Sequence, residues 1–349
     1  MNRQELERLV SLGEPVIAAD LSGADLSGID LGGAIFERVR LRGADLRSAK
    51  LDEATLAECD LTESRLSGAR LRHAIFFRCE GKRAAFEGAD LTAARAAVCK
   101  LGEANFRGAV TAALAFVDCD LTSASFEETL LDRAVLIRAR LGGARLRGAK
   151  LVRANLIDVD LRTADLEGVT WDKVVFDKAN LAGRSFAGLD LRMTQLMEAE
   201  LAGCDFSGAR LDQSNFKGSD LTGARFDGAS AKNTLFVEAK LGRASLRGAD
   251  LSQSIFVDAE LSSASFATAT LYQACFHRAR CAGAKFAGSD MTYADLSWAD
   301  LTSADFTGAT LFRARFHRTR EEGAVFSNRA AALGDDEELA RAERFTPAV

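Results

Sequence analysis

The side chains that most often carry chemistry are few or regularly spaced in this sequence. It contains only three histidines, His73, His277 and His317. No serine-centred nucleophile motif, phosphate-cradling loop or zinc-ligand spacing accompanies them. The many Asp residues recur at regular intervals, as on a solvated face, and repeating residues alone do not build a concave pocket. We therefore expect no catalytic residue, no bound metal and no cofactor, and we predict that the protein is not an enzyme.

Four cysteines, Cys59, Cys79, Cys99 and Cys119, lie twenty residues apart. They could form a metal or redox site, or they could fill inward positions where alanine usually stands. Cβ atoms stacked at the spacing of neighbouring strands are slightly too far apart for disulfides, so we favour the filler interpretation. The chain has seven cysteines in all, and they follow no disulfide framework. Reduced thiols in a cytoplasm are expected.

Charge and hydropathy exclude several classes of partner. The chain carries 45 basic and 50 acidic side chains, a net charge of −5. This mixed surface gives no general attraction to nucleic acid or to anionic membranes. Residues 1–15 lack the apolar stretch of a signal peptide, and no run of about 18 apolar residues could span a membrane. We expect neither direct nucleic-acid binding nor a membrane span.

A five-residue repeat organises almost the whole chain. From Leu21, a large apolar residue that we name the centre recurs every fifth position, and a small residue stands two places before it. Ala24-Asp25-Leu26-Ser27-Gly28 is one such unit. No insertion breaks the frame between about residue 16 and residue 326. A pattern of this kind predicts stacked repeats that share one continuous core.

The unit resembles the A(D/N)LXX motif of pentapeptide repeat proteins, and the resemblance covers nearly nine-tenths of the chain. It implies an all-β fold: a right-handed, four-sided parallel β-helix with four pentapeptides in each coil. In that fold the centre and the small residue point inward.

Two sequence features independently predict a coil of twenty residues. Phe is confined to two alternate frames of centres, exemplified by Phe86 and Phe36, while the frames between them are almost all Leu. Gly recurs two places after the first Phe frame, as at Gly28, whereas the second has charged residues there, as at Arg38. Since Gly suits a turn that needs positive φ, we predict that the two Phe faces end in different turns.

The predicted organisation has three parts. Residues 1–15 form an N-terminal cap helix, residues 16–326 the β-solenoid, and residues 327–349 a C-terminal tail with a short helix. Asp335 and Glu338 have capping-box spacing before that helix, which is expected to end near Phe345. It could close the last coil or mediate dimerisation.

Some positions break the rule. The small centres Gly81, Ala96 and Thr111 predict a thinner or distorted core. Arg184 stands at an inward small-residue position, where an unpaired guanidinium would be costly, so a local bulge or a carboxylate partner is expected. With large residues nearby, we predict a bend within residues 165–200.

On one predicted face the outward residues are apolar rather than polar. They are Ile75, Phe77, Val117, Val135, Ile137, Ile157, Val175, Met197, Leu235, Val237, Ile255 and Val257. Monomers rarely expose so long an apolar strip, so we predict that it binds a protein partner or a second copy of the chain, for example in a homodimer. The alternative is that β-branched residues there only favour strands.

One coil is also strongly basic. Residues 133–153 contain no acidic residue. Their cations are Arg133, Arg138, Arg140, Arg145, Arg147, Lys150 and Arg153, which we name the basic belt. The belt could be a solvated surface or a docking site for an acidic partner.

The favoured functional hypothesis is a protein-binding scaffold or adaptor. The family resemblance allows a role in a bacterial multi-protein machine such as a secretion apparatus. It also allows a DNA mimic that binds DNA gyrase or a related topoisomerase, as in quinolone resistance. Such mimics have a strongly acidic rod, whereas the outward charges alternate here and the basic belt interrupts any acidic face.

Overall fold

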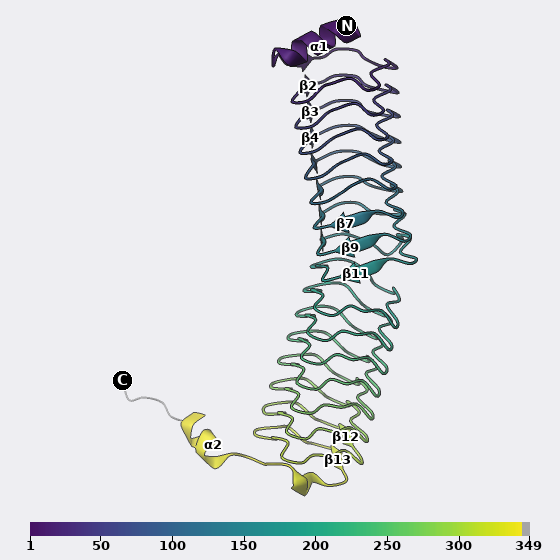
Figure 1. Cartoon of the computed structure of the whole chain (residues 1–349). Helices are drawn as coiled ribbons and strands as arrows, with labels where there is room; N and C mark the ends of the chain where they lie inside the picture. The colour runs from purple at the N-terminus through teal and green to yellow at the C-terminus, as the bar shows by residue number, and fades with distance from the viewer. Residues whose placement is uncertain (344–349) are drawn as a thin grey trace, which may run out of the picture. The chain divides into compact units, whose positions relative to one another are not determined.

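The computed structural model describes residues 1–343 and comprises two compact units, Met1–Asn180 and Leu181–Val349. In each unit the chain winds as a parallel β-solenoid whose backbone partners lie twenty residues apart, such as Phe36 with Leu56 and Leu235 with Ile255. The coils stack on one another along each unit (Figure 1), and a turn or bend recurs about every five residues within a coil. We name the four faces after one centre each: the Leu21, Phe86, Leu31 and Phe36 faces. The predicted fold class is confirmed.

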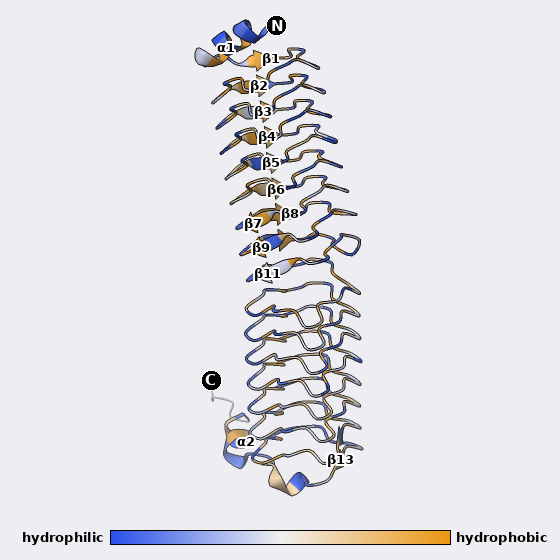
Figure 2. Cartoon of the chain, turned by 45° about the vertical axis from the view of Figure 1, so that its right-hand side comes forward, coloured by the Kyte–Doolittle hydropathy of each residue, from blue (hydrophilic) through white to orange (hydrophobic). Residues whose placement is uncertain are grey.

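In the N-terminal unit the Phe36 face carries a regular sheet (Figure 2). Its eight parallel strands are β1 (Val16–Ile17), β2 (Ile35–Glu37), β3 (Thr55–Ala57), β4 (Ile75–Phe77), β5 (Arg95–Ala97), β6 (Ala115–Val117), β8 (Val135–Ile137) and β10 (Asn155–Ile157). A second sheet lies on the Leu31 face and contains β7 (Leu130–Asp132), β9 (Lys150–Val152) and β11 (Thr170–Asp172).

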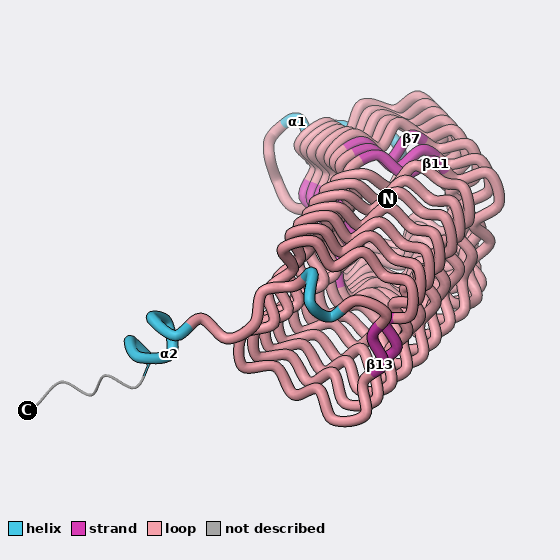
Figure 3. Tube along the Cα trace, turned by 90° about the horizontal axis from the view of Figure 1, so that it is seen from below, coloured by secondary structure: helices cyan, strands magenta, loops and turns pink. Residues whose placement is uncertain are grey.

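In the C-terminal unit most coils pair through single bridges rather than strands. The exceptions among its described residues are β12 (Asp305–Phe306) and β13 (Val325–Phe326). The backbone bonds are as short as in a regular sheet, since the Phe236 N–H donates to the Ile255 carbonyl over 2.7 Å. Seen end-on, the nearest coils have four sides (Figure 3).

The predicted inward positions form the core. Leu and Phe centres and the small residues before them are almost completely buried. Phe rings stack along a face at the coil spacing, as in Phe236–Phe256 (4.8 Å) and Phe256–Phe276 (4.7 Å). Rings from the two opposite Phe faces meet edge to face, as Phe256 does with Phe266 at 5.6 Å. The alternation of Phe and Leu frames therefore reflects direct aromatic packing across the coil.

The Asp residue of the repeat closes the turn that follows it. Its carboxylate accepts a hydrogen bond from the backbone N–H two residues later, as in Asp60 with Thr62 (2.9 Å) and Asp300 with Thr302 (3.1 Å). This is an Asx turn, and either Asp or Asn can form it. The recurring Asp residues thus have a structural role in the repeat.

The prediction that the two Phe faces end in different turns holds in only part of the chain. In the N-terminal unit β2–β6 occupy the Phe36 face, while the Phe86 face has turns without strands. In the C-terminal unit both faces have the same turn, so the prediction is wrong there. Gly28 (φ 63°) and Arg38 (φ 54°) are both left-handed, so Gly does not mark a distinct turn.

Helix α1 (Arg3–Ser11) covers the first coil (Figure 1). The Asn2 side chain caps it by accepting a hydrogen bond from the Glu5 N–H (2.9 Å). Leu6 is fully buried, and the Arg3 guanidinium donates to the Ser27 carbonyl (3.1 Å). The helix therefore shields the end of the core from water.

The short 3₁₀ helix η1 (Arg329–Ala331) and the segment after it close the last coil. Leu333 pairs with Arg315 in parallel, and the Arg329 guanidinium lies 4.3 Å from the centre of the Phe316 ring. Arg329 also pairs with Glu321 at 2.8 Å, which satisfies this charged centre. The following helix α2 (Glu337–Glu343) stands beside the coils (Figure 3). Phe345 lies outside the described residues.

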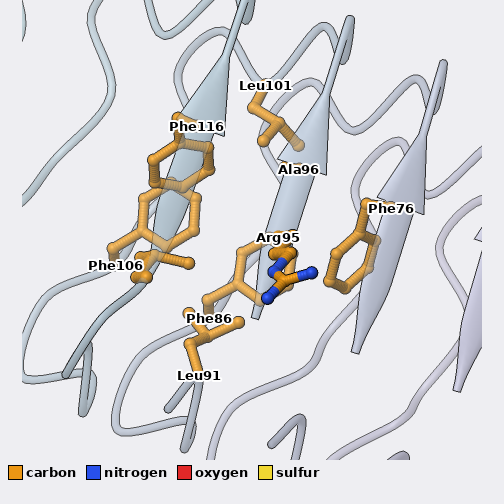
Figure 4. Close-up of a pocket in the computed structure, with 9 residues that line it drawn as sticks. Phe76, Phe86, Leu91, Arg95, Ala96, Leu101, Phe106 and Phe116 are labelled. Atoms are coloured by element: carbon orange, nitrogen blue, oxygen red, sulfur yellow. The ribbon is translucent and has the colours of Figure 1, made fainter. Parts of the chain in front are cut away.

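Of the three small centres, Ala96 does leave the core thinner. A cavity of about 10 Å³ lies beside Ala96, among Phe76, Phe86, Phe106 and other apolar side chains (Figure 4). Gly81 has no such space, because a Cβ atom there would lie 2.7 Å from Leu101 Cδ2. Thr111 is buried and donates its hydroxyl to the Leu130 carbonyl (2.7 Å).

Arg184 keeps the backbone register of its neighbours. Its N–H donates to the Leu181 carbonyl, and its own carbonyl accepts from the Asp205 N–H, both over 3.0 Å. The predicted bulge is therefore absent at this residue, and its side chain is only half-buried. The division between the two units falls within residues 165–200, and the bend proposed for that segment stays a prediction.

Candidate interaction surface

The Phe36 face of the N-terminal unit presents apolar side chains to the outside. Val117, Ile137 and Ile157 lie in register on neighbouring strands, and Val135 is paired with Ala115. These side chains are half-buried because each lies against the equivalent residue of the next coil. On an earlier coil Ile75 and Phe77 are 42% and 39% exposed.

The strip is not continuous. Arg95 and Ala97 separate Ile75 and Phe77 from the apolar coils that follow. Charged corner residues border it: the Arg138 guanidinium pairs with Asp118 (2.6 Å). The strip therefore has an apolar centre and a rim of ion pairs.

The C-terminal unit carries an apolar patch of its own, beside centres of the same sequence frame. Leu235 pairs with Ile255, which pairs with Cys275. Val237 and Val257 flank the same centres and are half-buried. Together, the predicted strip residues are all outward: Ile75, Phe77, Val117, Val135, Ile137, Ile157 and Val175 in the first unit, and Met197, Leu235, Val237, Ile255 and Val257 in the second.

Carboxylates of neighbouring coils neutralise most of the basic belt. Arg138 and Arg140 pair with Asp118 (2.6 Å) and Asp120 (3.6 Å), which lie one coil earlier. The remaining arginines are paired as follows: Arg133 and Arg153 with Asp132, Arg145 with Glu127, and Arg147 with Asp165 and Glu167. Within residues 1–343, only Lys150 of the belt makes no ion pair. Apart from the Arg133–Asp132 contact between adjacent residues, the belt is therefore a set of inter-coil pairs rather than a cationic surface.

The cysteine ladder is buried and its thiols are free. Cys79 and Cys99 donate to the carbonyls of Leu56 (3.3 Å) and Phe76 (3.5 Å) on the preceding coil. Contacts between neighbouring thiols shift their pKa values in opposite directions, raising the pKa of Cys79 and lowering that of Cys99. Buried thiols that donate to main-chain carbonyls act as small packing groups, which favours the filler interpretation. In the described part of the chain, no three His, Cys, Asp or Glu residues could hold a metal ion.

Four exposed aromatic residues were not among the predicted site residues. Tyr272, Tyr293 and Phe312 form an edge-to-face cluster with ring centres 6.0 and 5.8 Å apart. Trp298 is 46% exposed, and the Arg318 guanidinium lies 5.8 Å from its ring. The sequence does hold a signal for them: aromatic residues that fall outside the five-residue frame of centres must point outward.

The described helices offer no candidate for a membrane span, because none is both long and apolar enough.

Comparisons with known proteins agree with this architecture. A family model described as "Pentapeptide repeat region" matches residues 29–106. A second, "Pentapeptide repeats (8 copies)", matches residues 115–151, 154–192, 175–213, 199–236, 244–280 and 279–318. No curated protein sequence matches the chain.

Several solved structures also match the chain in part. A trypsin-treated variant of QnrB1, a plasmid-mediated fluoroquinolone resistance protein, is 20% identical, with 54% of this chain and 88% of that chain covered and a TM-score of 0.43. HetL, a pentapeptide repeat protein involved in heterocyst differentiation regulation in Nostoc sp. strain PCC 7120, is 23% identical, with coverages of 93% and 97% and a TM-score of 0.26. Rfr23 from the cyanobacterium Cyanothece 51142 is 18% identical, with coverages of 42% and 91% and a TM-score of 0.23.

Proposed function

Because the chain belongs to the pentapeptide repeat family, we propose that it is a non-catalytic scaffold that binds a protein partner through its Phe36 face. The observation that carries this proposal is the register of Val117, Ile137 and Ile157, which places branched apolar side chains side by side on the outer wall. Outward positions elsewhere are mostly charged or polar, so this strip is the surface that gains most from being covered.

The chemistry of the strip indicates the kind of partner. Its apolar centre with a rim of ion pairs, such as Arg138–Asp118, matches the composition of protein interfaces. A partner with an apolar patch and polar surroundings would complement it. Assembly within a multi-protein machine, such as a secretion apparatus, is a setting in which a rigid scaffold of this kind would act.

A charge substitution on the strip tests the proposal. We expect the double variant Val117→Glu, Ile137→Glu to lose the partner that the wild-type chain retains from its source extract, by at least about a hundredfold in affinity. Light scattering on the purified chain shows whether that partner is a second copy. Circular dichroism checks that the solenoid is intact.

The matched control is the double variant Arg65→Glu, Ala85→Glu. These two residues are paired on adjacent coils of the opposite face. The control should retain the partner. Equal retention by both double variants would contradict the proposal.

The alternative of a DNA mimic predicts a different surface. Exposed carboxylates here pair with cations of the next coil, as in Asp20–Arg40 (2.9 Å) and Asp30–Lys50 (3.0 Å). Alternating charge does not imitate the uniform charge of a phosphate backbone. We expect the protein to leave the supercoiling activity of DNA gyrase unchanged, and inhibition would favour the mimic.

A further inference from the structure

Helix α2 lies against the C-terminal end of the Phe36 face and is held there mainly by polar contacts. The Asp336 carboxylate caps the helix by accepting from the Leu339 N–H (3.0 Å), so the cap is Asp336 rather than the predicted Asp335. Asp335 instead accepts from the Arg318 N–H (2.8 Å). Of the helix residues, only Ala340 is buried.

The last residue of α2, Glu343, places its carboxylate between a histidine and an arginine of the last coils. The Glu343 carboxylate lies 3.3 Å from His317 Nε2 and 3.4 Å from Arg318 Nε. His317 Nδ1 accepts a hydrogen bond from the Asp336 N–H (3.1 Å), so the ring proton is on Nε2 and is donated to Glu343. The His317 side chain is only 4% exposed, which fixes the direction of this donor.

Helix α2 is held weakly enough to detach from the solenoid. A helix of seven residues is not stable by itself, and Leu339 remains 47% exposed. A hollow of about 320 Å³ remains beneath the helix and its linker, lined in part by Ser297, Arg315 and Leu333. Arg315 makes no ion pair within residues 1–343, and the carboxylates that line this hollow with it, Asp335 and Asp336, come from the linker and start of α2.

A second hollow lies beside Arg318. It has a volume of about 430 Å³ and is lined by Trp298, Arg318, Asp300 and three arginines, Arg278, Arg280 and Arg320. Those three pair with Asp258, Glu260 and Asp300. Trp298 offers an exposed ring beside the Arg318 guanidinium, and Trp and Arg are the residues that most often dominate binding energy at protein interfaces.

We propose that His317, Arg318 and Trp298 form a binding site for an acidic peptide segment of another protein, and that Glu343 of α2 is its internal occupant. His317 Nε2 and Arg318 Nε bind one carboxylate of the segment. Arg315 attracts a further acidic residue. This site recognises charge, so it is separate from the apolar strip and does not depend on the function proposed above.

The test uses a fluorescent peptide with the sequence of residues 335–343, DDEELARAE, and the full-length chain. In the wild type, α2 competes from a short linker at high effective concentration, so binding of the peptide should be weak. The variant Glu343→Gln loses the charge-assisted contacts of the internal occupant. It should bind the peptide about tenfold more tightly, measured by fluorescence anisotropy.

A second substitution in the Glu343→Gln background locates the site. Arg318→Gln should reduce binding at least about tenfold, because the carboxylate loses its charged partner. Arg78→Gln is the matched control, since Arg78 stands at the same corner of the Phe36 face beside the Phe77 ring, and it should leave binding unchanged. Trp298→Phe in the same background removes the indole beside Arg318 and should weaken binding of the peptide, measured by the same anisotropy.

Three results would overturn the proposal. They are no binding by the Glu343→Gln variant, equal loss in the Arg318→Gln and Arg78→Gln variants, and equal binding of a peptide with every Glu replaced by Lys. Val117→Glu, Ile137→Glu should bind the acidic peptide as the wild type does. The two proposals are therefore tested separately: the strip variants report on binding at the Phe36 face, and the peptide reports on the site around His317 and Arg318.

Discussion

At the scale of single residues, the corners of the coil demand an unusual backbone. The residue two places after each centre commonly adopts the left-handed backbone conformation. Many of these residues are not Gly: Arg78 has φ 52° and Val98 has φ 57°. An L-residue in this region costs about 1–2 kcal/mol. The fold holds it there because its N–H donates to the next coil, as Val98 does to the Val117 carbonyl (3.0 Å).

Val98 is the clearest case, because a β-branched side chain is especially unsuited to positive φ. Its side chain is 49% exposed and contributes little burial. We expect Val98→Gly to stabilise the protein by about 0.5–1 kcal/mol, measured as a rise in the urea midpoint. Val110→Gly is the control: Val110 is equally exposed but lies in a bridge between coils, so its loss should lower the midpoint. A fall in both variants would contradict this explanation.

At the scale of the coil, the interior is a stack of layers whose fit can be read centre by centre. Leu and Phe centres fill each layer, and Ala96 leaves a gap between Phe76 and Phe116 on its own face (Figure 4). Gly81 is smaller still but leaves no gap, because Leu101 occupies the space above it. Residue size alone therefore does not identify an underpacked layer.

This difference predicts opposite effects of two enlarging substitutions. Ala96→Val should stabilise the protein by up to about 1 kcal/mol, because the added methyl groups enter an existing apolar cavity. Gly81→Ala should be destabilising, since its Cβ would lie 2.7 Å from Leu101 Cδ2 unless the leucine moves. Denaturation midpoints measure both effects. A stabilising Gly81→Ala would show that the layer is looser than described.

The turns also make the coil sensitive to acid. Hydrogen bonds from the Arg47 side chain and backbone hold the pKa of Asp45 at about 2, and Arg138 lowers the pKa of Asp118. Carboxyls whose pKa is lower in the folded state stabilise it fully above about pH 4, the pKa in the unfolded chain. That stabilisation is lost as the pH falls from about 4 to about 2.

We therefore expect the urea midpoint to be constant from about pH 7 to 5 and to fall on further acidification. Asp45→Asn keeps an Asx turn but cannot titrate, so it should make the fall smaller. A midpoint that is independent of pH down to about 2, or that rises, would contradict this account of the turns.

At the scale of the whole molecule, the five-residue frame was sufficient to predict the coil, the inward residues and the outward position of Val117 and Ile137. The five-residue period of the sequence is found again in the structure because every coil repeats one local geometry. The pairing of the basic belt could have been predicted too, since Arg138 and Asp118 lie one coil apart. Docking of Glu343 on His317 could not, because the chain leaves the frame after residue 326 and no periodicity relates the two.

The central claim is that the Phe36 face binds a protein partner, and site-specific photo-crosslinking in the source cell measures this most directly. A photoreactive amino acid at Val117 or Ile137 lies on the Phe36 face, and at Ala85 it lies on the opposite face with similar exposure. The account predicts a discrete covalent adduct, with a partner or a second copy, from Val117 and Ile137 but not from Ala85. Adducts from Ala85 alone, or equal adducts from all three positions, would contradict it.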